Sequence, residues 1–157
     1  AKRAKGFDMR IQSVSRTANA NFEIETGAKY VSLEELLESS DFISLHCPLT
    51  EETHHLLNQE NLQKIKKGAF LINTARGPII DEKALLQVLK DGTLAGAGLD
   101  VYEFEPQVTP ELMQLDNVVL LPHIGSATVE TRAEMSCICA RNVIAVLENQ
   151  KPLTPVF

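Results

Sequence analysis

The sequence predicts an α/β protein built on a doubly wound parallel sheet. Short apolar runs that read as strands alternate along the chain with segments of helical periodicity. Runs such as AFLI (residues 69–72) are continuously apolar, which is typical of parallel strands covered by helices on both faces. With 157 residues and 44% hydrophobic content, the chain can bury one ordinary core.

The first half of the chain contains two predicted strands with a helix between them. MRIQSV (residues 9–14) is the first strand candidate, and DFISLHCP (residues 41–48) is the second, which ends at its proline. Between them, Ser32 and Glu35 match a capping box, which predicts a helix over LEELLES (residues 33–39).

Two helices and a strand are predicted in the middle of the chain. The first helix begins at Asn58 and is closed by Gly68, and the strand AFLIN (residues 69–73) follows it. Asp81 is the predicted N-cap of the next helix, EKALLQVLKDG (residues 82–92).

The last part of the chain contains two more strands and a long helix. The strands are LAGAGLD (residues 94–100) and NVVLLP (residues 117–122), and the helix is predicted from Ser126 to Gln150. Its apolar positions recur at helical spacing and are Ala133, Cys137, Ala140, Ile144 and Leu147.

The start of the chain departs from the usual plan of a doubly wound domain, which opens with a strand, a glycine turn and a helix. AKRAK (residues 1–5) resembles a helix already under way, and no G-x-G-x-x-G occurs. We therefore expect residues 1–125 to be a partial dinucleotide-binding, Rossmann-like domain without its first strand and glycine turn, from the C-terminal part of a longer protein. Residues 126–157 are expected to be a helix and tail that pack against an absent substrate domain.

Composition excludes several classes of partner. The net charge of -6 and a pI near 5.2 offer no basic surface for nucleic acid or anionic lipid. No apolar run approaches the roughly 18 residues of a membrane span, and no signal peptide is evident, so we expect a soluble cytoplasmic protein. Cys47, Cys137 and Cys139 form no CxxC pair, which indicates reduced thiols and no metal site.

Five polar residues fall just beyond the predicted strands, where open parallel sheets bind their ligands. They are Arg16, His46, Arg76, Asp100 and His123. Taken singly, Arg76 is more simply read as a solvated loop residue, His123 as a helix-entry histidine and Glu105 as a surface acid. The shared location of the five residues favours a binding site.

Three segments then carry a family resemblance. NTARGPIID (residues 73–81), GLDVYEFEP (residues 98–106) and LLPHIGSAT (residues 120–128) resemble, in order and spacing, the signature segments of the D-isomer-specific 2-hydroxyacid dehydrogenases. The resemblance is strongest to the glyoxylate/hydroxypyruvate reductase branch. It implies an oxidoreductase that transfers a hydride between a nicotinamide cofactor and a small 2-oxo or 2-hydroxy acid, favoured as glyoxylate or hydroxypyruvate, in a homodimer.

The resemblance assigns catalytic roles to Arg76, Glu105 and His123. A guanidinium fork binds a substrate carboxylate bidentately. Imidazole titrates near neutral pH, so His123 can give a proton to the developing alkoxide and take it back in the reverse direction. The carboxylate of Glu105 is expected to orient that ring.

The same resemblance and the strand ends predict a cofactor-binding set. Asp100 is expected to orient the nicotinamide carboxamide, and Ser126 either touches substrate or, as we favour, caps the long helix. The full set is Ser15, Arg16, Thr17, Cys47, Pro48, Thr74, Ala75, Asp100, His123 and Gly125.

The end of the first predicted strand bears on cofactor choice. NAD-specific proteins place an Asp or Glu there to bind the adenosine ribose, but Ser15 stands in that neighbourhood, and no acid occurs between Met9 and Phe22. Ser15, Arg16 and Thr17 offer donors and one positive charge, so NADP is favoured over NAD.

Other interpretations remain open. His54 and His55 have no acid at a useful spacing and are predicted to be solvated or to lie at a helix start, and no role is expected for the imidazole of His46. The scaffold also resembles dinucleotide-binding transcriptional corepressors, although the short ending NQKPLTPVF lacks their long extension. A bare nucleotide-binding module is the third interpretation.

Overall fold

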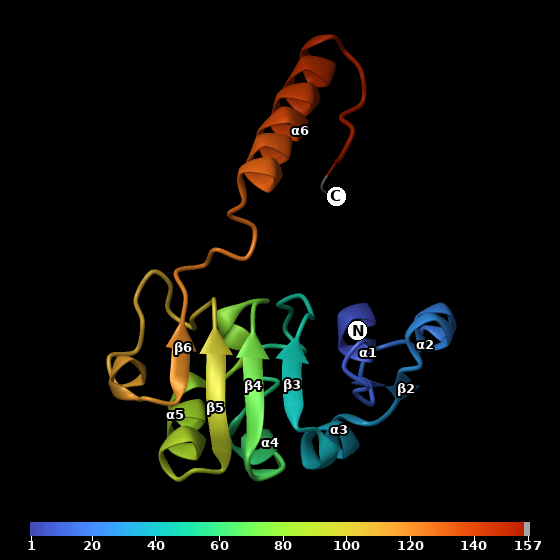
Figure 1. Cartoon of the computed structure of the whole chain (residues 1–157). Coiled ribbons are helices and arrows are strands. Elements are labelled where there is room, and N and C mark those ends of the chain that lie inside the picture. The colour runs from blue at the N-terminus through green and yellow to red at the C-terminus, as the bar shows by residue number, and fades with distance from the viewer. Residues whose placement is uncertain (156–157) are drawn as a thin grey trace. The chain divides into compact units, whose positions relative to one another are not determined.

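The computed structural model describes residues 1–155 and divides into two compact units. The first unit runs from Ala1 to His123 and contains every strand of the described residues (Figure 1). The second unit begins at Ile124 and contains one long helix, α6 (Val129–Leu147).

A four-stranded parallel sheet forms the centre of the first unit. Its strands are β3 (Phe42–Leu45), β4 (Ala69–Asn73), β5 (Leu94–Leu99) and β6 (Val118–Leu120), paired in that order. Each pair is parallel, so all four carboxyl ends meet at one edge, as the arrows in Figure 1 show. The predicted parallel sheet is confirmed for these four strands.

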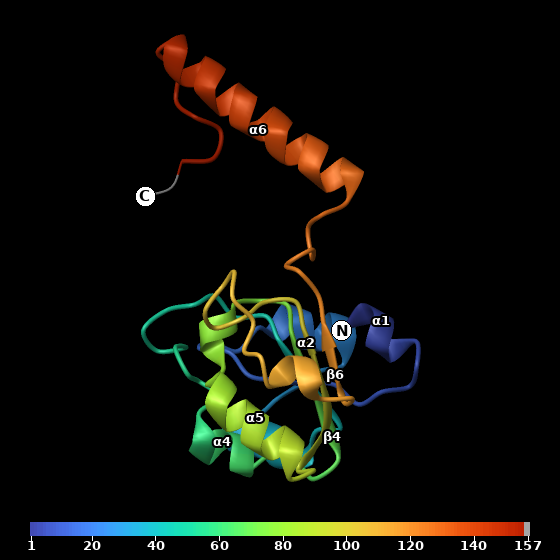
Figure 2. The same ribbon diagram turned by 90° about the vertical axis from the view of Figure 1, so that its left-hand side faces the viewer.

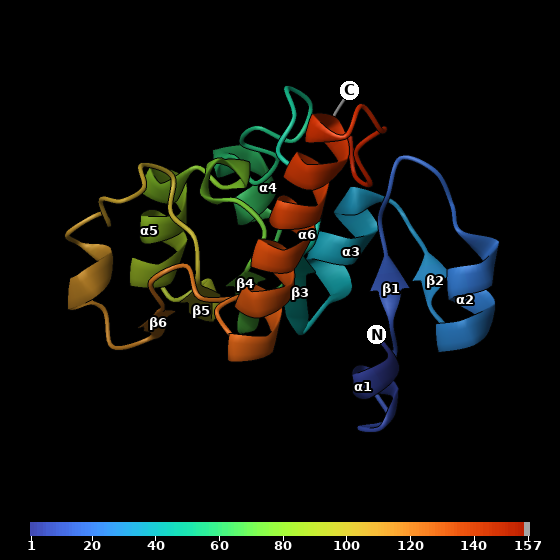
Figure 3. The ribbon, with the colours of Figure 1, turned by 90° about the horizontal axis from the view of Figure 1, so that it is seen from above.

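A separate two-stranded parallel sheet pairs β1 (Gln12–Ser13) with β2 (Lys29–Tyr30). It lies beyond the β3 edge of the main sheet (Figure 3), where the Gln12 side chain accepts hydrogen bonds from Ser39 and Ser40. The strand predicted over residues 9–14 is limited to Gln12 and Ser13, the two residues that pair with β2.

Strand β2 and the helix that precedes it were not predicted, whereas the short helix at the start of the chain was expected. After the short helix α1 (Lys2–Lys5), helix α2 (Ala20–Thr26) begins where the Asn19 side chain accepts from the Phe22 N–H at 3.0 Å. It ends at Gly27, whose φ of 73° is left-handed. Asparagine before and glycine after were the sequence signals for this helix.

Three helices cover one face of the main sheet. They are α3 (Leu33–Ser39), α4 (Gln59–Gln63) and α5 (Glu82–Lys90), and Figure 2 shows α4 and α5 on the same side of it. Ser32, Asn58 and Asp81 cap them as predicted, each side chain accepting from the backbone N–H three residues on. Only half of the predicted capping box forms, since the Glu35 carboxylate binds Lys29 at 3.0 Å. Helix α4 ends five residues before Gly68, because residues 64–68 form a turn.

Within the first unit only one face of the main sheet is covered, whereas both faces were predicted to be covered. Along β4, Ala69 and Leu71 are buried under the helices, whereas Phe70 and Ile72 are exposed. Phe42 on β3 is also exposed and stacks on Phe70, with ring centroids 5.4 Å apart. Although the run AFLIN is continuously apolar up to Asn73, buried and exposed side chains alternate along β4.

The second unit begins differently from the prediction. Thr128, and not Ser126, is the N-cap of α6, and its hydroxyl accepts from the Thr131 N–H at 3.1 Å. The predicted apolar stripe of this helix is largely exposed within the unit, while the tail folds back so that the Asn142 side chain binds Leu153 and Thr154. Among residues 1–155, the structure contains no helix of the length and apolar character needed to cross a bilayer.

Candidate active site

The NTARG segment forms a tight loop at the carboxyl end of β4, and Asn73 holds it closed. This side chain is buried; its amide nitrogen donates to the Arg76 carbonyl at 2.9 Å, and its amide oxygen accepts from the Ala75 N–H at 3.0 Å. The loop therefore presents Thr74, Ala75 and Arg76 at the strand end. Sequence reasoning assigned no role to Asn73, although an Asx turn after a strand is a recognisable signal.

Gly77 brings this loop against the segment that follows β5. A Cβ atom at this position would lie 1.8 Å from the Tyr102 carbonyl oxygen, so only glycine fits. The short 3-10 helix η1 (Gly77–Ile79) starts at this contact. On the other side of the loop, the Asp100 N–H donates to the Asn73 carbonyl at 2.9 Å. The chain segments carrying Arg76 and Asp100 are thus fastened to each other.

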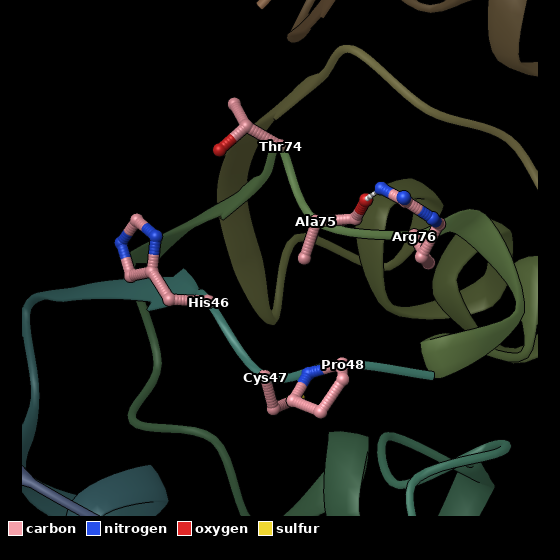
Figure 4. Close-up of a pocket in the computed structure, with 6 residues that line it drawn as sticks. All are labelled: His46, Cys47, Pro48, Thr74, Ala75 and Arg76. Carbon is pink, nitrogen blue, oxygen red and sulfur yellow. Dashed lines mark hydrogen bonds between the residues drawn. The ribbon is translucent and has the colours of Figure 1, made fainter. Parts of the chain in front are cut away.

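Six residues from the ends of β3 and β4 line one pocket of about 390 Å³. Figure 4 shows these side chains, with the Arg76 guanidinium turned back to donate to the Ala75 carbonyl at 2.7 Å. We call it the strand-end pocket, and its lining is His46, Cys47, Pro48, Thr74, Ala75 and Arg76. It brings together four predicted cofactor residues with Arg76 and with His46, whose Nε2 contacts the Ser44 hydroxyl at 2.9 Å. Partial burial raises the pKa of the Cys47 thiol, which keeps the sulfur neutral at physiological pH.

Beyond β6, His123 and Glu105 form a hydrogen-bonded pair. His123 Nδ1 lies 2.9 Å from Glu105 Oε2, and the Tyr102 N–H donates to Glu105 Oε1 at 3.1 Å. The pair is open to solvent, with 50% of the histidine side chain and 35% of the glutamate side chain exposed. The two predicted partners are therefore in contact through Nδ1 of the ring.

Tyr102 anchors the segment that carries Glu105. Its hydroxyl donates to the Leu121 carbonyl at 2.7 Å and so ties this segment to the end of β6. Burial, followed by the neighbouring charge of Asp100, raises the pKa of the phenol. Tyr102 and Glu105 also help to line a second pocket of about 350 Å³ beside His123. In this parallel sheet the ends of β4 and β6 are two strand spacings apart, which is about 10 Å.

The residues proposed to read the cofactor ribose follow β1. The Ser15 hydroxyl donates to the Thr17 carbonyl at 2.7 Å, and the exposed Arg16 guanidinium lies 3.9 Å from the Glu52 carboxylate. Sequence reasoning missed Glu52, because it is 36 positions away in the chain. Gly125, also in the predicted set, belongs to the second unit.

The prediction that His55 lacks an acidic partner is wrong. Its Nε2 lies 2.7 Å from Glu103 Oε1, in a part-buried contact across 48 residues of sequence. His54 stays near the surface, and its ring packs on that of His55 at a centroid distance of 4.1 Å. No spacing rule could have found a pair this far apart in the chain.

Comparison with known proteins agrees with this geometry. Residues 1–125 match the family model described as D-isomer specific 2-hydroxyacid dehydrogenase, NAD binding domain. The chain is 53% identical over 152 residues to the glyoxylate reductase of Thermococcus litoralis, a match that covers 97% of this chain and 46% of that protein. The chain thus spans about half the length of the curated relatives it matches.

Two solved structures have the same fold. A protein of Thermus thermophilus superposes with a TM-score of 0.92 at 46% identity, over 99% of this chain and 49% of that one. The NADPH-dependent glyoxylate/hydroxypyruvate reductase of Sinorhizobium meliloti, solved with NADP and malonate, gives 0.90 at 37% identity over 98% and 47%. These matches lend no support to the corepressor-like alternative. The chain belongs to the D-isomer-specific 2-hydroxyacid dehydrogenase family.

Proposed function

We propose that the full-length protein is a nicotinamide-dependent reductase of small 2-oxo acids, with glyoxylate or hydroxypyruvate as the favoured substrate. The observation that carries this proposal is the contact of His123 Nδ1 with Glu105 at the ligand-binding edge of a parallel sheet. The similarity to glyoxylate reductases supports the choice of substrate.

In this proposal three side chains divide the work. Arg76 binds the substrate carboxylate with its planar fork, which also places the adjacent carbonyl carbon. His123 donates a proton from Nε2 to the carbonyl oxygen, because Nδ1 is engaged by Glu105. Glu105 contacts Nδ1 and so holds the orientation of the ring. The bound cofactor supplies the hydride.

The strand-end pocket fits one end of such a cofactor. The neutral Cys47 thiol, Pro48 and Ala75 offer apolar surface, and Thr74 adds a hydroxyl. Asp100 follows β5 at the same edge of the sheet and is proposed to orient the carboxamide. These residues are proposed to hold the nicotinamide end, with Ser15, Arg16 and Thr17 toward the adenosine end.

The test of function is turnover of glyoxylate by the purified full-length protein, compared with its Arg76→Lys variant. Lysine keeps the charge but loses the bidentate geometry, so kcat/KM should fall at least about 100-fold. Absence of turnover with glyoxylate and hydroxypyruvate would refute the proposed activity, and an unchanged variant would remove Arg76 from the mechanism.

NADP is the proposed cofactor preference, because no acid precedes or follows Arg16 within β1 and its loop. Glu52 lies close enough to Arg16 to compete with a 2′-phosphate for the guanidinium, so substituting Glu52 tests the same contact from the other side. The ratio of kcat/KM for NADPH over NADH should exceed one, fall about tenfold or more in Arg16→Ala, and rise in Glu52→Gln. A wild-type ratio below one, or a ratio indifferent to Arg16→Ala, would contradict the preference.

The remaining expectations concern the setting of the enzyme. A homodimer is proposed from the family resemblance, and the cytoplasm remains the location expected from the sequence. Light scattering of the full-length protein, which should give twice the chain mass, and cell fractionation test the two statements separately.

A further inference from the structure

Glu103, two residues before Glu105, is held by three hydrogen bonds. Its backbone N–H donates to Glu82 Oε1 at 2.7 Å, its Oε2 accepts from the Glu82 N–H at 3.0 Å, and its Oε1 meets His55 Nε2 at 2.7 Å. Only 12% of the Glu103 side chain is exposed. A carboxylate so enclosed is fixed in one orientation, unlike that of a surface glutamate.

Glu82 completes the other half of this arrangement. It is the first residue of α5, is 4% exposed, and its second carboxylate oxygen accepts from the Thr109 hydroxyl at 2.5 Å. Glu82 and Glu103 therefore bind each other's backbone N–H reciprocally. The segment after β5 is fastened to the start of α5 on both sides of Glu105.

His55 joins a third segment to the cluster. Its backbone N–H donates to the Pro78 carbonyl at 2.8 Å, directly after the NTARG loop. The backbone at His55 is left-handed, with a φ of 49°, and in this conformation the ring contacts Glu103. We call His55, Glu82, Glu103 and Thr109 the anchor cluster, and it lies outside the predicted catalytic and cofactor sets.

Glu103 of the anchor cluster directly follows Tyr102, the residue whose N–H holds Glu105. Fixing the Glu103 backbone thus fixes the direction of the neighbouring peptide groups, and with them the carboxylate that contacts His123. We propose that Glu103 is a positioning residue, which sets the geometry of the His123–Glu105 pair through the 102–103 backbone. This inference rests on the proposed function for its kinetic consequence.

Kinetics of the full-length protein test the inference with three variants. Glu103→Ala removes both side-chain hydrogen bonds and should lower kcat for glyoxylate about 10- to 100-fold, because a small displacement of a catalytic group has effects of that size. KM for glyoxylate and the Kd for the cofactor should change less than about threefold, since Arg76 and the strand-end pocket are untouched. Glu103→Gln keeps the shape and an acceptor for the Glu82 N–H and should restore kcat to within about threefold of wild type.

The matched control is Glu111→Ala, which removes an exposed carboxylate from the same connection between β5 and β6. It should leave kcat unchanged. A wild-type kcat in Glu103→Ala, a loss shared with Glu111→Ala, or a loss confined to KM would overturn the inference.

A second measurement separates this inference from the proposed function. Amide hydrogen exchange at Tyr102 reports whether its N–H still binds Glu105, without any turnover. Exchange there should accelerate at least about tenfold in Glu103→Ala and in Glu105→Ala, but not in Glu111→Ala. Inactive wild-type protein with this exchange pattern would sink the reductase proposal alone, whereas unchanged exchange in Glu103→Ala would sink the positioning role.

If Glu103→Ala does not fold, His55→Asn provides the test. Asparagine tolerates the left-handed backbone but is too short to reach Glu103. This variant should lower kcat about three- to tenfold and accelerate Tyr102 exchange, and failure to do either would overturn the inference.

Discussion

Two glutamates on the segment that follows β5 each pair with a histidine from another part of the chain, and the surroundings of the two pairs are opposite. His123 and Glu105 are 2.9 Å apart at the open edge of the sheet, and half of the imidazole is exposed. His55 and Glu103 are 2.7 Å apart in the anchor cluster, where the glutamate is enclosed. Glu103 and Glu105 are only two positions apart in the chain, yet one belongs to an enclosed pair and the other to an open pair.

The two pairs differ in side-chain exposure and in how firmly the glutamate backbone is held. Both oxygens of Glu103 are engaged by protein groups, and its backbone N–H is engaged as well. At the open pair both oxygens of Glu105 are engaged as well, but 50% of the His123 side chain is exposed, against 33% for His55. An enclosed pair holds structure, whereas an exposed imidazole can exchange a proton with a ligand.

The largest expected effect separates the two histidines by activity. In the full-length protein His123→Ala should lower kcat by about 10²- to 10⁴-fold with an unchanged cofactor Kd, because it removes the proposed proton donor. His55→Asn should cost less than about tenfold. Steady-state kinetics with glyoxylate measure both, and equal losses would remove the distinction between an open and a closed pair.

The next effect separates the two glutamate environments by stability. Glu82→Ala leaves the Glu103 N–H and the Thr109 hydroxyl without their buried partner and should lower the free energy of unfolding by about 2 to 3 kcal/mol. Glu105→Ala, at the open pair, should cost about 1 kcal/mol or less. Urea unfolding of the full-length variants measures the order, and a reversed order would contradict the contrast.

The smallest effect concerns Tyr102, which directly precedes Glu103 in the chain and whose N–H donates to Glu105. Tyr102→Phe removes the hydrogen bond to the Leu121 carbonyl and should cost about 1 kcal/mol at neutral pH. Because the folded state raises the pKa of this phenol, its contribution is present below about pH 10 and is lost as the pH rises through the raised folded value. Urea unfolding at pH 8 and pH 11 should show a smaller alkaline loss in Tyr102→Phe.

Tyr30→Phe is the matched control for that measurement. Its hydroxyl also donates to a backbone carbonyl, that of Ser15 at 2.7 Å, but the side chain is substantially exposed. The control should cost less than about 0.5 kcal/mol and leave the alkaline loss intact. Identical pH behaviour of the two variants would show that Tyr102 does not carry the effect.

Much of the main sheet was predictable because its signals are local. An apolar run such as AFLIN and a capping residue such as Asp81 act over a few neighbouring positions. The open pair was predictable only through the family resemblance, since Glu105 and His123 are 18 positions apart. Helix α2 and strand β2 were missed because their apolar patterns are short, and the cap at Thr128 was assigned to Ser126 because both residues are plausible N-caps.

By itself the sequence determined the order of the four main-sheet strands and the helices between them, the residues at the carboxyl ends of those strands and the family signature, because propensities, caps and motifs depend on near neighbours. Tertiary structure decided which face of the sheet is covered and which partner each acid has. Glu103 meets His55 across 48 positions, and Gly77 is required by a carbonyl 25 positions away. Such contacts form only when the tertiary fold brings distant segments of the chain together, and no local sequence pattern predicts which segments will meet.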